Sequence, residues 1–157
     1  NYRLAAQQRG VSLRLSAGSH MQAKVEADIA LIERVLQNLI DNALRYTPPG
    51  GSVELAIDDQ GSCMQISVSD NGCGIDSALQ ARVFEPFFTT RRMLGGSGLG
   101  LYIVNQIVTR QFGGSITLHG GAGRGARFVM HFPSVARHSS DIGRILAALP
   151  RAPVDEA

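Results

Sequence analysis

Lysine is the scarcest charged residue in this chain. Lys24 is the only lysine among 157 residues, and the other basic side chains are fourteen arginines. A phosphate-binding loop of the G-x-x-x-x-G-K-[ST] type needs a lysine directly after its glycines, whereas Lys24 follows Gln22 and Ala23. The eukaryotic-type protein kinase motifs H-R-D and D-F-G are also absent from the sequence. These two ways of binding ATP are therefore excluded.

Other scarcities limit where this chain works and what it contacts. No apolar run approaches about 18 residues and no signal-peptide pattern opens the sequence, so we expect no membrane contact by this chain. The net charge is only +2 and the arginines are scattered, which argues against nucleic acid as a partner. The two cysteines fit a reducing compartment, so we expect a cytoplasmic location. The sequence begins at Asn1 rather than Met, which suggests a piece of a longer protein.

Residues 31–46 have the strongest pattern in the sequence. Apolar side chains recur every three or four residues, which predicts a helix packed on a core, with Asp28 as its N-cap. Asn38, Asn42 and Arg45 share one stripe of that helix. Asparagine is a mediocre helix former, and such local inconsistencies tend to mark functional sites. Two amide oxygens and a guanidinium could hold a hard cation and a phosphate; the alternative is a solvated polar stripe.

The remaining pattern predicts one globular domain at residues 11–135. The predicted strands are 11–15, 23–27, 52–57, 64–69, 115–119 and 128–132, and the further helices are 76–83 and 101–112. Residues 1–10 are predicted to be the remnant of an upstream helix or linker, and residues 136–157 an extension that can form a helix at 140–149. A strand at 63–70 would be about 23 Å long at roughly 3.3 Å per residue. Cys63 and Cys73 would then lie beyond disulfide reach.

Two glycine-rich stretches are candidate ligand sites. Asp70-Asn71-Gly72-Cys73-Gly74-Ile75 places a carboxylate at a strand end, before glycines that let a ligand or another backbone come close. The alternative for this stretch is an ordinary Asn-Gly turn. The glycines of residues 95–100 precede a helix, whose first N–H groups can bind phosphate. Taken alone, this second stretch is a weak signal.

Residues 77–94 lack strong periodicity, although they include a proline-interrupted aromatic run. A segment of this length without periodic apolar residues in a compact domain predicts a functional lid rather than a plain connection. We call residues 77–94 the lid segment. We expect Phe84, Phe87 and Phe88 to attach it to the core, and its order to increase when its ligand is bound.

The order of four motifs is more specific than any one of them. The motifs are Asn38-Leu39-x-x-Asn42-Ala43, Asp70-x-Gly72-x-Gly74, Phe84-Glu85-Pro86-Phe87 and Gly96-x-Gly98-x-Gly100. Over residues 11–133 the chain resembles the ATP-binding catalytic domain of bacterial sensor histidine kinases, in the ATPase and kinase group that includes gyrase B, Hsp90 and MutL. The resemblance implies an α/β (α+β) two-layer sandwich of the Bergerat type. A mixed, mostly antiparallel sheet of about five strands would be covered on one face by three helices, with ATP between the helices and the lid segment.

The resemblance implies ATP and Mg²⁺ as cofactors, and it implies roles for the residues that match. The nucleotide-binding set is Asn38, Asn42, Arg45, Tyr46, Asp70, Gly72, Gly74, Ile75, Phe88, Thr89, Arg91, Arg92, Gly96, Gly98, Leu99, Gly100 and Leu101. Within this set, Asn38, Asn42 and Arg45 form the catalytic group. Asn42 would be the main magnesium ligand, with Asn38 beside it, and Arg45 would reach the phosphates. On the lid segment, either Arg91 or Arg92 could reach the terminal phosphate; the alternative is a solvated pair.

The resemblance also implies how the base is bound. Asp70 would accept a hydrogen bond from the adenine amino group, which is a donor. Gly72 and Gly74 would let the base lie against the backbone, and Tyr46 would be a neighbour of the ribose or the adenine. Ala126 departs from the family pattern, because a threonine or serine is common at that position. A hydroxyl contact there is therefore in doubt.

The acceptor histidine of such kinases lies on a separate dimerisation domain, where a carboxylate usually follows it. The four histidines of this chain are followed by Met, Gly, Phe and Ser, so none fits. The resemblance therefore implies the catalytic domain of a protein-histidine kinase, monomeric by itself, whose parent is a homodimer that serves a response regulator indirectly. The parent could be anchored in the inner membrane. The alternatives are an ATP-hydrolysing conformational clamp of the gyrase, Hsp90 and MutL type and a nucleotide-binding module without chemistry.

One position separates the kinase from the clamp. In the ATPase relatives, a glutamate stands one helical turn before the magnesium asparagine and acts as the general base for water. Here that position holds Asn38, whose neutral amide cannot accept a proton. We therefore expect slow ATP hydrolysis by this chain, with the γ-phosphate left for a histidine on another domain.

Overall fold

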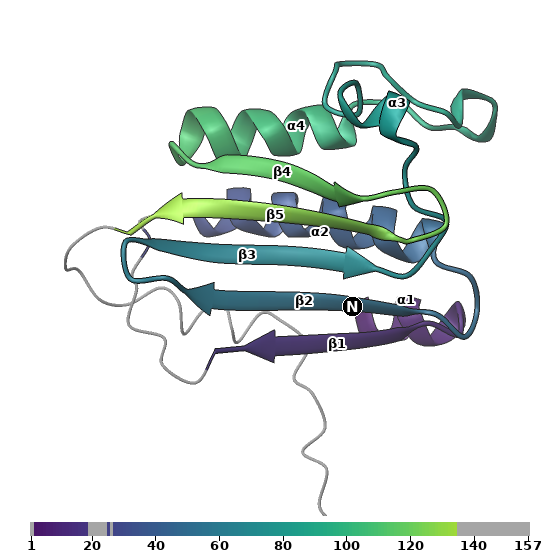
Figure 1. The fold of residues 1–157 in the computed structure, drawn as a ribbon, viewed down its shortest axis with the longest axis horizontal. Coiled ribbons are helices and arrows are strands. Elements are labelled where there is room, and N and C mark those ends of the chain that lie inside the picture. Colours follow the sequence, from purple (N-terminus) through teal and green to yellow (C-terminus); the bar gives the residue numbers. More distant parts are fainter. Residues whose placement is uncertain (1, 19–24, 26, 135–157) are drawn as a thin grey trace, which may run out of the picture.

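In the described part of the chain, five strands form one sheet in the order β1-β2-β3-β5-β4 (Figure 1). The computed structural model describes residues 2–18, 25 and 27–134. The strands are β1 (Ser12–Ala17), β2 (Ser52–Asp59), β3 (Cys63–Asp70), β4 (Ser115–Gly120) and β5 (Ala126–Pro133). β1 runs parallel to β2, and the other neighbouring pairs are antiparallel. The predicted mixed, mostly antiparallel sheet is confirmed.

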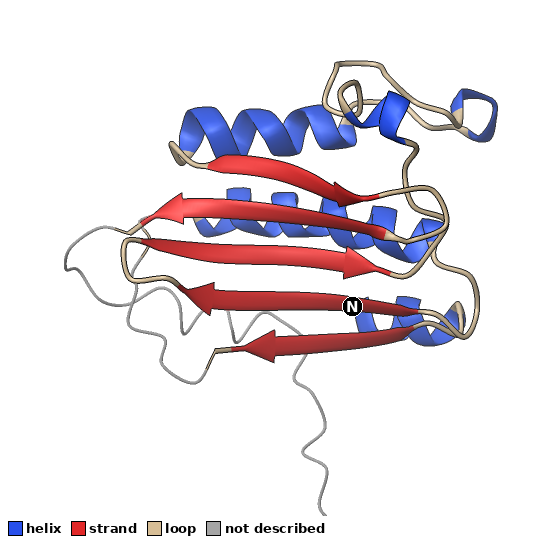
Figure 2. Ribbon diagram, viewed as in Figure 1, coloured by secondary structure: helices blue, strands red, loops and turns tan. Residues whose placement is uncertain are grey.

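Helices cover one face of this sheet (Figure 2). The helical elements of the described residues are α1 (Tyr2–Gln8), α2 (Ile29–Tyr46), α3 (Ser77–Gln80), the 3₁₀ turn η1 (Arg92–Leu94), α4 (Gly100–Gln106) and the π-helical turn η2 (Ile107–Gln111). α2 packs on β2 and β3, α1 packs on β1, and η2 packs on β4. The predicted two-layer sandwich with a one-sided helical cover is confirmed, and α3 is a short helix in the lid segment.

The core lies between the sheet and the helices because both present apolar residues with the expected periods. In α2 the buried side chains recur every three or four residues: Ile32, Val35, Leu36, Leu39, Ile40, Ala43 and Leu44. In β2 alternate side chains are buried, namely Val53, Leu55 and Ile57. Asp28 caps α2 as predicted, and its side chain accepts a hydrogen bond from the Ala30 N–H at 2.9 Å.

The strand predicted at residues 23–27 is not found at the residues of that range that the structure describes. Val25 and Ala27 are its described residues, and neither belongs to a strand; the others lie outside the described residues. Both side chains pack against the core. Their apolar character therefore serves packing rather than sheet pairing. The helix predicted at 140–149 also lies outside the described residues.

One predicted helix is shorter in the structure, and another changes from α-helical to π-helical turns. α3 has only four residues, and the Asp76 side chain caps it by accepting from the Ala78 N–H at 2.8 Å. Pro86 disfavours helical backbone at the residue before it, and turns follow α3. α4 gives way to the π-helical turn η2, in which the Phe112 N–H donates to the carbonyl oxygen of Ile107 at 3.2 Å.

The site is positioned by the arrangement of α2, α4 and the lid segment. α2 and α4 contact each other, and the chain passes from the end of β3 through the lid segment to α4 at one end of the sheet (Figure 1). Cys63 and Cys73 are free thiols, as predicted. Within the ranges that the structure describes, no helix combines the length and the hydropathy needed to cross a membrane.

Candidate functional site

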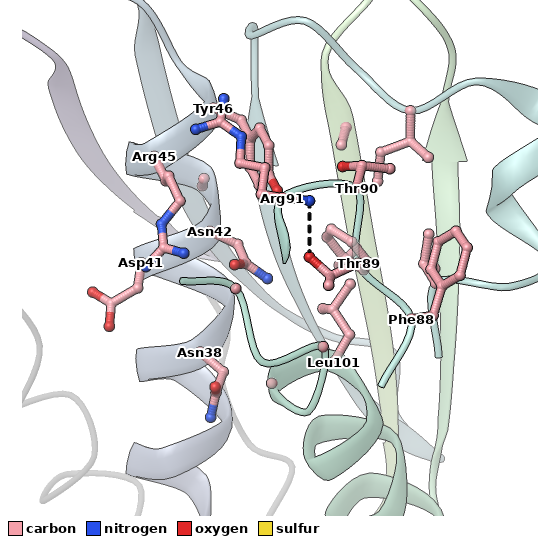
Figure 3. Close-up of a pocket in the computed structure, with 18 of the residues that line it drawn as sticks. Asn38, Asp41, Asn42, Arg45, Tyr46, Phe88, Thr89, Thr90, Arg91 and Leu101 are labelled. Carbon is pink, nitrogen blue, oxygen red and sulfur yellow. Dashed lines mark hydrogen bonds between the residues drawn. The ribbon is translucent and has the colours of Figure 1, made fainter. Parts of the chain in front are cut away.

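A cavity of about 710 Å³ opens between α2, α4, the loop after β3 and the lid segment (Figure 3). It brings together every predicted site residue except Gly72 and Arg92. These lining residues are Asn38, Asn42, Arg45, Tyr46, Asp70, Gly74, Ile75, Phe88, Thr89, Arg91, Gly96, Gly98, Leu99, Gly100 and Leu101. Motifs that are up to about sixty residues apart along the sequence therefore line the same cavity.

Gly72 and Arg92 are not among the residues that line the cavity. Gly72 is buried behind its wall, where a Cβ would overlap the carbonyl oxygen of Tyr46. Glycine at this position lets the end of α2 and the loop after β3 pack closely. Arg92 donates from Nη2 to the carbonyl oxygen of Phe87 at 2.9 Å. Its guanidinium therefore holds a turn of the lid segment.

The two asparagines of α2 line the cavity. Asn38 donates from Nδ2 to the carbonyl oxygen of Arg34 at 2.8 Å, which leaves Oδ1 as its free acceptor. A Cβ at Gly100 would lie 2.9 Å from this Oδ1, so a side chain at the start of α4 would displace the amide. Asn42 and Arg45 also line the cavity, and Figure 3 shows Asn42 directed toward the lid segment and Arg45 beside Asp41. The stripe predicted from the helical spacing is therefore present.

Asparagine amide oxygens are suitable ligands for Mg²⁺ that is bound together with phosphates. Mg²⁺ prefers oxygen ligands and usually keeps water or phosphate oxygens among them. The residues that the structure describes contain no group of three or more His, Cys, Asp or Glu side chains arranged to hold a metal. The amide oxygens of Asn42 and Asn38 could hold a cation in this cavity together with phosphate oxygens.

Asp70, the last residue of β3, adds a carboxylate near the end of α2. The N–H groups of Gly72 and Ala126 donate to its Oδ1 at 2.9 and 3.3 Å. No described residue hydrogen-bonds Oδ2, so this oxygen is available to a donor in the cavity. Burial raises the pKa of the Asp70 carboxyl group, and the two backbone hydrogen bonds act in the opposite direction. Position 126 thus contributes a backbone contact where the family often has a hydroxyl.

The loop after β3 is held in place by the turn between β4 and β5, a contact that the sequence did not predict. A Cβ at Gly74, whose φ is +69°, would overlap the carbonyl oxygen of Gly121, so glycine is required there. Gln80 of α3 donates from Nε2 to the carbonyl oxygens of Ile75 and Gly120, both at 3.0 Å. These contacts join the loop after β3, α3 and the turn between β4 and β5. No helical or strand periodicity in the sequence relates such separate segments, so the contacts could not be predicted.

Of the three predicted aromatic residues, Phe84 attaches the lid segment to the core. Phe84 packs edge-to-face on Phe128 of β5, with 6.2 Å between ring centroids, and Phe88 lines the cavity. The prediction that Phe87 also anchors the lid segment is wrong, since its side chain is 61% exposed. Its backbone has a φ of +65°, and its N–H donates to the carbonyl oxygen of Gly98 at 3.0 Å. This unusual conformation turns the side chain outward.

Arg91 is the lid arginine that lines the cavity. Its guanidinium carbon lies 4.6 Å from the centroid of the Tyr46 ring. Its N–H donates to Thr89 Oγ1 at 3.0 Å, and its carbonyl oxygen accepts from the N–H groups of Leu94 and Gly96 at 3.0 and 3.1 Å. The sequence could not decide which of Arg91 and Arg92 faces the ligand; in the structure Arg91 lines the cavity and Arg92 does not.

Further residues line the cavity that were not in the predicted nucleotide-binding set. They are Arg34, Gln37, Asp41, Ala43, Cys73, Asp76, Leu79, Val83, Thr90, Gly95, Ser97, Ile103, Ala126 and Phe128. Arg34 and Asp41 lie four residues before and three residues after Asn38, so helical spacing could have identified them. Ala126 and Phe128 come from β5; the sequence pointed to Ala126 only through its missing hydroxyl, and Phe128 carries no comparable pattern.

Comparison with known proteins places this site in a family. A model described as "Histidine kinase-, DNA gyrase B-, and HSP90-like ATPase" matches residues 27–136. The alginate biosynthesis sensor protein KinB of Pseudomonas aeruginosa is 42% identical over 125 residues, which are 80% of this chain and 21% of KinB. The sensor-like histidine kinase SenX3 of Mycobacterium tuberculosis is 34% identical over 138 residues, covering 85% of this chain and 33% of SenX3. The chain thus spans about a fifth to a third of the length of these relatives.

Solved structures agree with this assignment. The catalytic domain of the histidine kinase ThkA, in a nucleotide-free form, has a TM-score of 0.75 and 28% identity, and the match covers 85% of both chains. Full-length ShkA in complex with AMPPNP has a TM-score of 0.73 and 30% identity, covering 87% of this chain and 29% of ShkA. This chain therefore belongs to the histidine kinase-, DNA gyrase B-, and HSP90-like ATPase family, and within it is an ATP-binding catalytic domain of the sensor histidine kinase type.

Proposed function

We propose that this chain binds Mg-ATP and transfers the γ-phosphate to a histidine on a separate dimerisation domain. The observation that carries the proposal is one cavity with two kinds of polar group. Asp70 offers a carboxylate oxygen suited to the adenine amino group, and Asn38 and Asn42 offer amide oxygens suited to a cation with phosphates. Full-length ShkA, which is similar to this chain, is known in complex with AMPPNP, and this supports a nucleotide as the ligand.

Each residue would act on a different part of the nucleotide. Asn42, with Asn38 beside it, would hold Mg²⁺, and Arg45 and Arg91 would contact the phosphates. The metal, when bound, would neutralise phosphate charge. Because Asn38 is a neutral amide, it would not act as the general base for an attacking water. A histidine needs no such base, since neutral imidazole attacks with its own lone pair.

The partners of this reaction follow from the same proposal. A histidine-bearing dimerisation domain of the same protein would supply the nucleophile, and a response regulator would take the phosphate from it. ThkA, which is 27% identical to this chain at a TM-score of 0.71, is known in complex with the response regulator TrrA. We also propose that the chain works in the cytoplasm and that its parent protein is a homodimer.

Calorimetric titration of the purified chain with ADP and ATP, with and without Mg²⁺, tests the binding half of the proposal. We expect both nucleotides to bind and Mg²⁺ to strengthen binding. Incubation with labelled ATP and a histidine-bearing dimerisation domain tests the transfer half. No binding of either nucleotide in the presence of Mg²⁺ would refute the proposal.

Replacing Arg91 with alanine is expected to weaken ATP binding while leaving ADP binding nearly unchanged. Its guanidinium lines the cavity, and only ATP has the terminal phosphate for it to contact. A hydrogen bond to a charged group contributes about 1.5–3 kcal/mol, so the preference for ATP over ADP should fall about tenfold or more. Calorimetry with the two nucleotides measures this ratio.

Arg92→Ala is the matched control for this prediction. Arg92 bonds the carbonyl oxygen of Phe87 within the lid segment, so its loss removes the same charge without removing a cavity-lining group. The preference for ATP over ADP should stay within about twofold of the original value. A larger drop in Arg92→Ala than in Arg91→Ala would show that the two arginines have been assigned the wrong way round.

A further inference from the structure

We infer that Tyr46 is a positioning residue for phosphate transfer, because its ring holds the Arg91 guanidinium at the cavity, ready for the terminal phosphate. This inference rests on the proposed function. It gives the Tyr46 ring a different partner from the ribose or adenine that the family resemblance implies.

The contact joins two sides of the cavity. Tyr46 is the last residue of α2, and Arg91 lies at the end of the lid segment, directly before η1. The 4.6 Å between the guanidinium carbon and the ring centroid is within the roughly 6 Å range of cation–π attraction. Both residues are half-buried, which limits the screening of this attraction by water. Figure 3 shows the two side chains together at the end of α2.

The backbone of Arg91 is fixed, so its side chain is the only part left to orient. Hydrogen bonds from Leu94 and Gly96 reach its carbonyl oxygen, and its own N–H bonds Thr89 Oγ1. A Cβ at Gly96 would lie 2.8 Å from that Oγ1 and 3.1 Å from the Arg91 carbonyl oxygen, so glycine allows this turn to close. The long arginine side chain nevertheless has many rotamers, and a contact at its tip removes most of them before a phosphate arrives.

The guanidinium keeps its hydrogen-bond donors while it rests on the ring. Among the described residues, it makes neither a hydrogen bond nor an ion pair. A π face attracts the cation without using its N–H groups, which remain available to phosphate oxygens. An ion pair with a carboxylate would also fix the side chain, but it would use those donors.

Tyr46 is itself a fixed platform. It ends α2, and its carbonyl oxygen packs against Gly72 so closely that no Cβ fits there. The position of the ring is therefore tied to the loop that carries Asp70. The face that contacts Arg91 cannot stack on a base or a sugar at the same time, so the two roles of the ring exclude each other on that face.

The test compares Tyr46→Leu and Tyr46→Phe, each with Arg91 present and in an Arg91→Ala background. The measured quantity is the ratio of ATP affinity to ADP affinity in Mg²⁺. Tyr46→Leu removes the π face, and we expect the ratio to fall about two- to fivefold, the range that an ordinary cation–π contact supplies. Tyr46→Phe keeps the face and should restore the ratio. In the Arg91→Ala background, Tyr46→Leu should have no further effect.

Other results would overturn the inference in distinguishable ways. An equal loss of ATP and ADP affinity in both backgrounds would assign the ring to the base or ribose, and a rise in ATP affinity in Tyr46→Leu would mean that the ring holds Arg91 away from the phosphate. Failure of the unchanged chain to bind ATP at all would refute the proposed function itself.

A measurement on the unmodified side chains removes any dependence on how Tyr46→Leu folds. In proton NMR of the nucleotide-free chain, the ring current of Tyr46 should shift the Arg91 δ-proton signals upfield. These signals are identified by their disappearance in Arg91→Ala, and they should keep their shift in Tyr46→Phe. Arg91 δ-protons at ordinary arginine shifts would show that the contact does not persist in solution and would overturn the inference.

Discussion

Replacing Asp70 with asparagine is expected to lower the affinity for ADP about tenfold or more while leaving the fold intact. The N–H groups of Gly72 and Ala126 both donate to Oδ1 of Asp70. In the variant these two donors still need an acceptor, so the amide oxygen takes the place of Oδ1 and the amide NH₂ group faces the cavity. This donor would then meet the adenine amino group, also a donor. Unpaired buried donors cost about 1–3 kcal/mol, which corresponds to roughly tenfold in Kd.

Guanine nucleotides supply a sharp control for this substitution. Guanine carries a carbonyl oxygen where adenine carries its amino group, so the NH₂ group in Asp70→Asn could donate to it. The affinity for GDP should therefore hold or rise while that for ADP falls. Calorimetry with both nucleotides measures the change. Unchanged ADP affinity would show that Asp70 does not bind the base, and an equal fall for both nucleotides would contradict the donor-against-donor explanation.

ADP binding should depend on pH through the protonation of the Asp70 carboxyl group. Burial raises the pKa of Asp70. A donor at Oδ2 favours the ionised form, so binding is strong above this pKa and is lost as the pH falls through it. Because the pKa is raised, the loss should begin at a higher pH than it would for an exposed aspartate. Affinity measured between neutral and acidic pH tests this, and Asp70→Asn should lack this transition.

Asn42→Ala is the second substitution with a large expected effect. It removes a proposed Mg²⁺ ligand from the cavity wall, so ATP affinity in Mg²⁺ should fall about tenfold or more and phosphate transfer should fall with it. Alanine is the stronger helix former, so α2 should not be weakened by the exchange. A loss of affinity can therefore be attributed to the site rather than to unfolding.

Chelation of Mg²⁺ shows whether that loss arises through the metal. With excess EDTA, the unchanged chain and Asn42→Ala should bind ATP with nearly equal affinity. Asn105→Ala is a matched exchange on α4, outside the cavity-lining residues, and should behave as the unchanged chain does. If the defect of Asn42→Ala were the same with and without Mg²⁺, Asn42 would not be a metal ligand.

The parts of the fold that were predictable are those governed by local spacing. α2 and its stripe of Asn38, Asn42 and Arg45 follow from the helical period, and most of the sheet follows from alternation. The strand predicted at 23–27 shows the limit of this reasoning. Val25 and Ala27 are apolar because they pack against the core, and alternation over a few residues does not distinguish such packing from strand pairing.

The site details that were not predictable depend on contacts between distant segments. Gln80 bonds Gly120 across 40 positions, and no sequence period reports such a bond. Phe87 was expected in the core because it is aromatic, but its positive φ turns it outward. The choice between Arg91 and Arg92 likewise depends on the turn that closes at Gly96, which directs one side chain to Tyr46 and the other to Phe87.

Steady-state ATP hydrolysis by the purified 157 residues, followed by label transfer to a supplied dimerisation domain, tests the central claim most directly. A positioned general base is typically worth about 10²–10⁴ in rate, and the neutral amide of Asn38 lacks that function. We therefore expect hydrolysis far below the roughly 1 s⁻¹ of slow ordinary enzymes, together with transfer of labelled phosphate to the histidine of the added domain. Hydrolysis on the order of 1 s⁻¹ without any transfer would contradict the kinase assignment and favour an ATP-driven clamp.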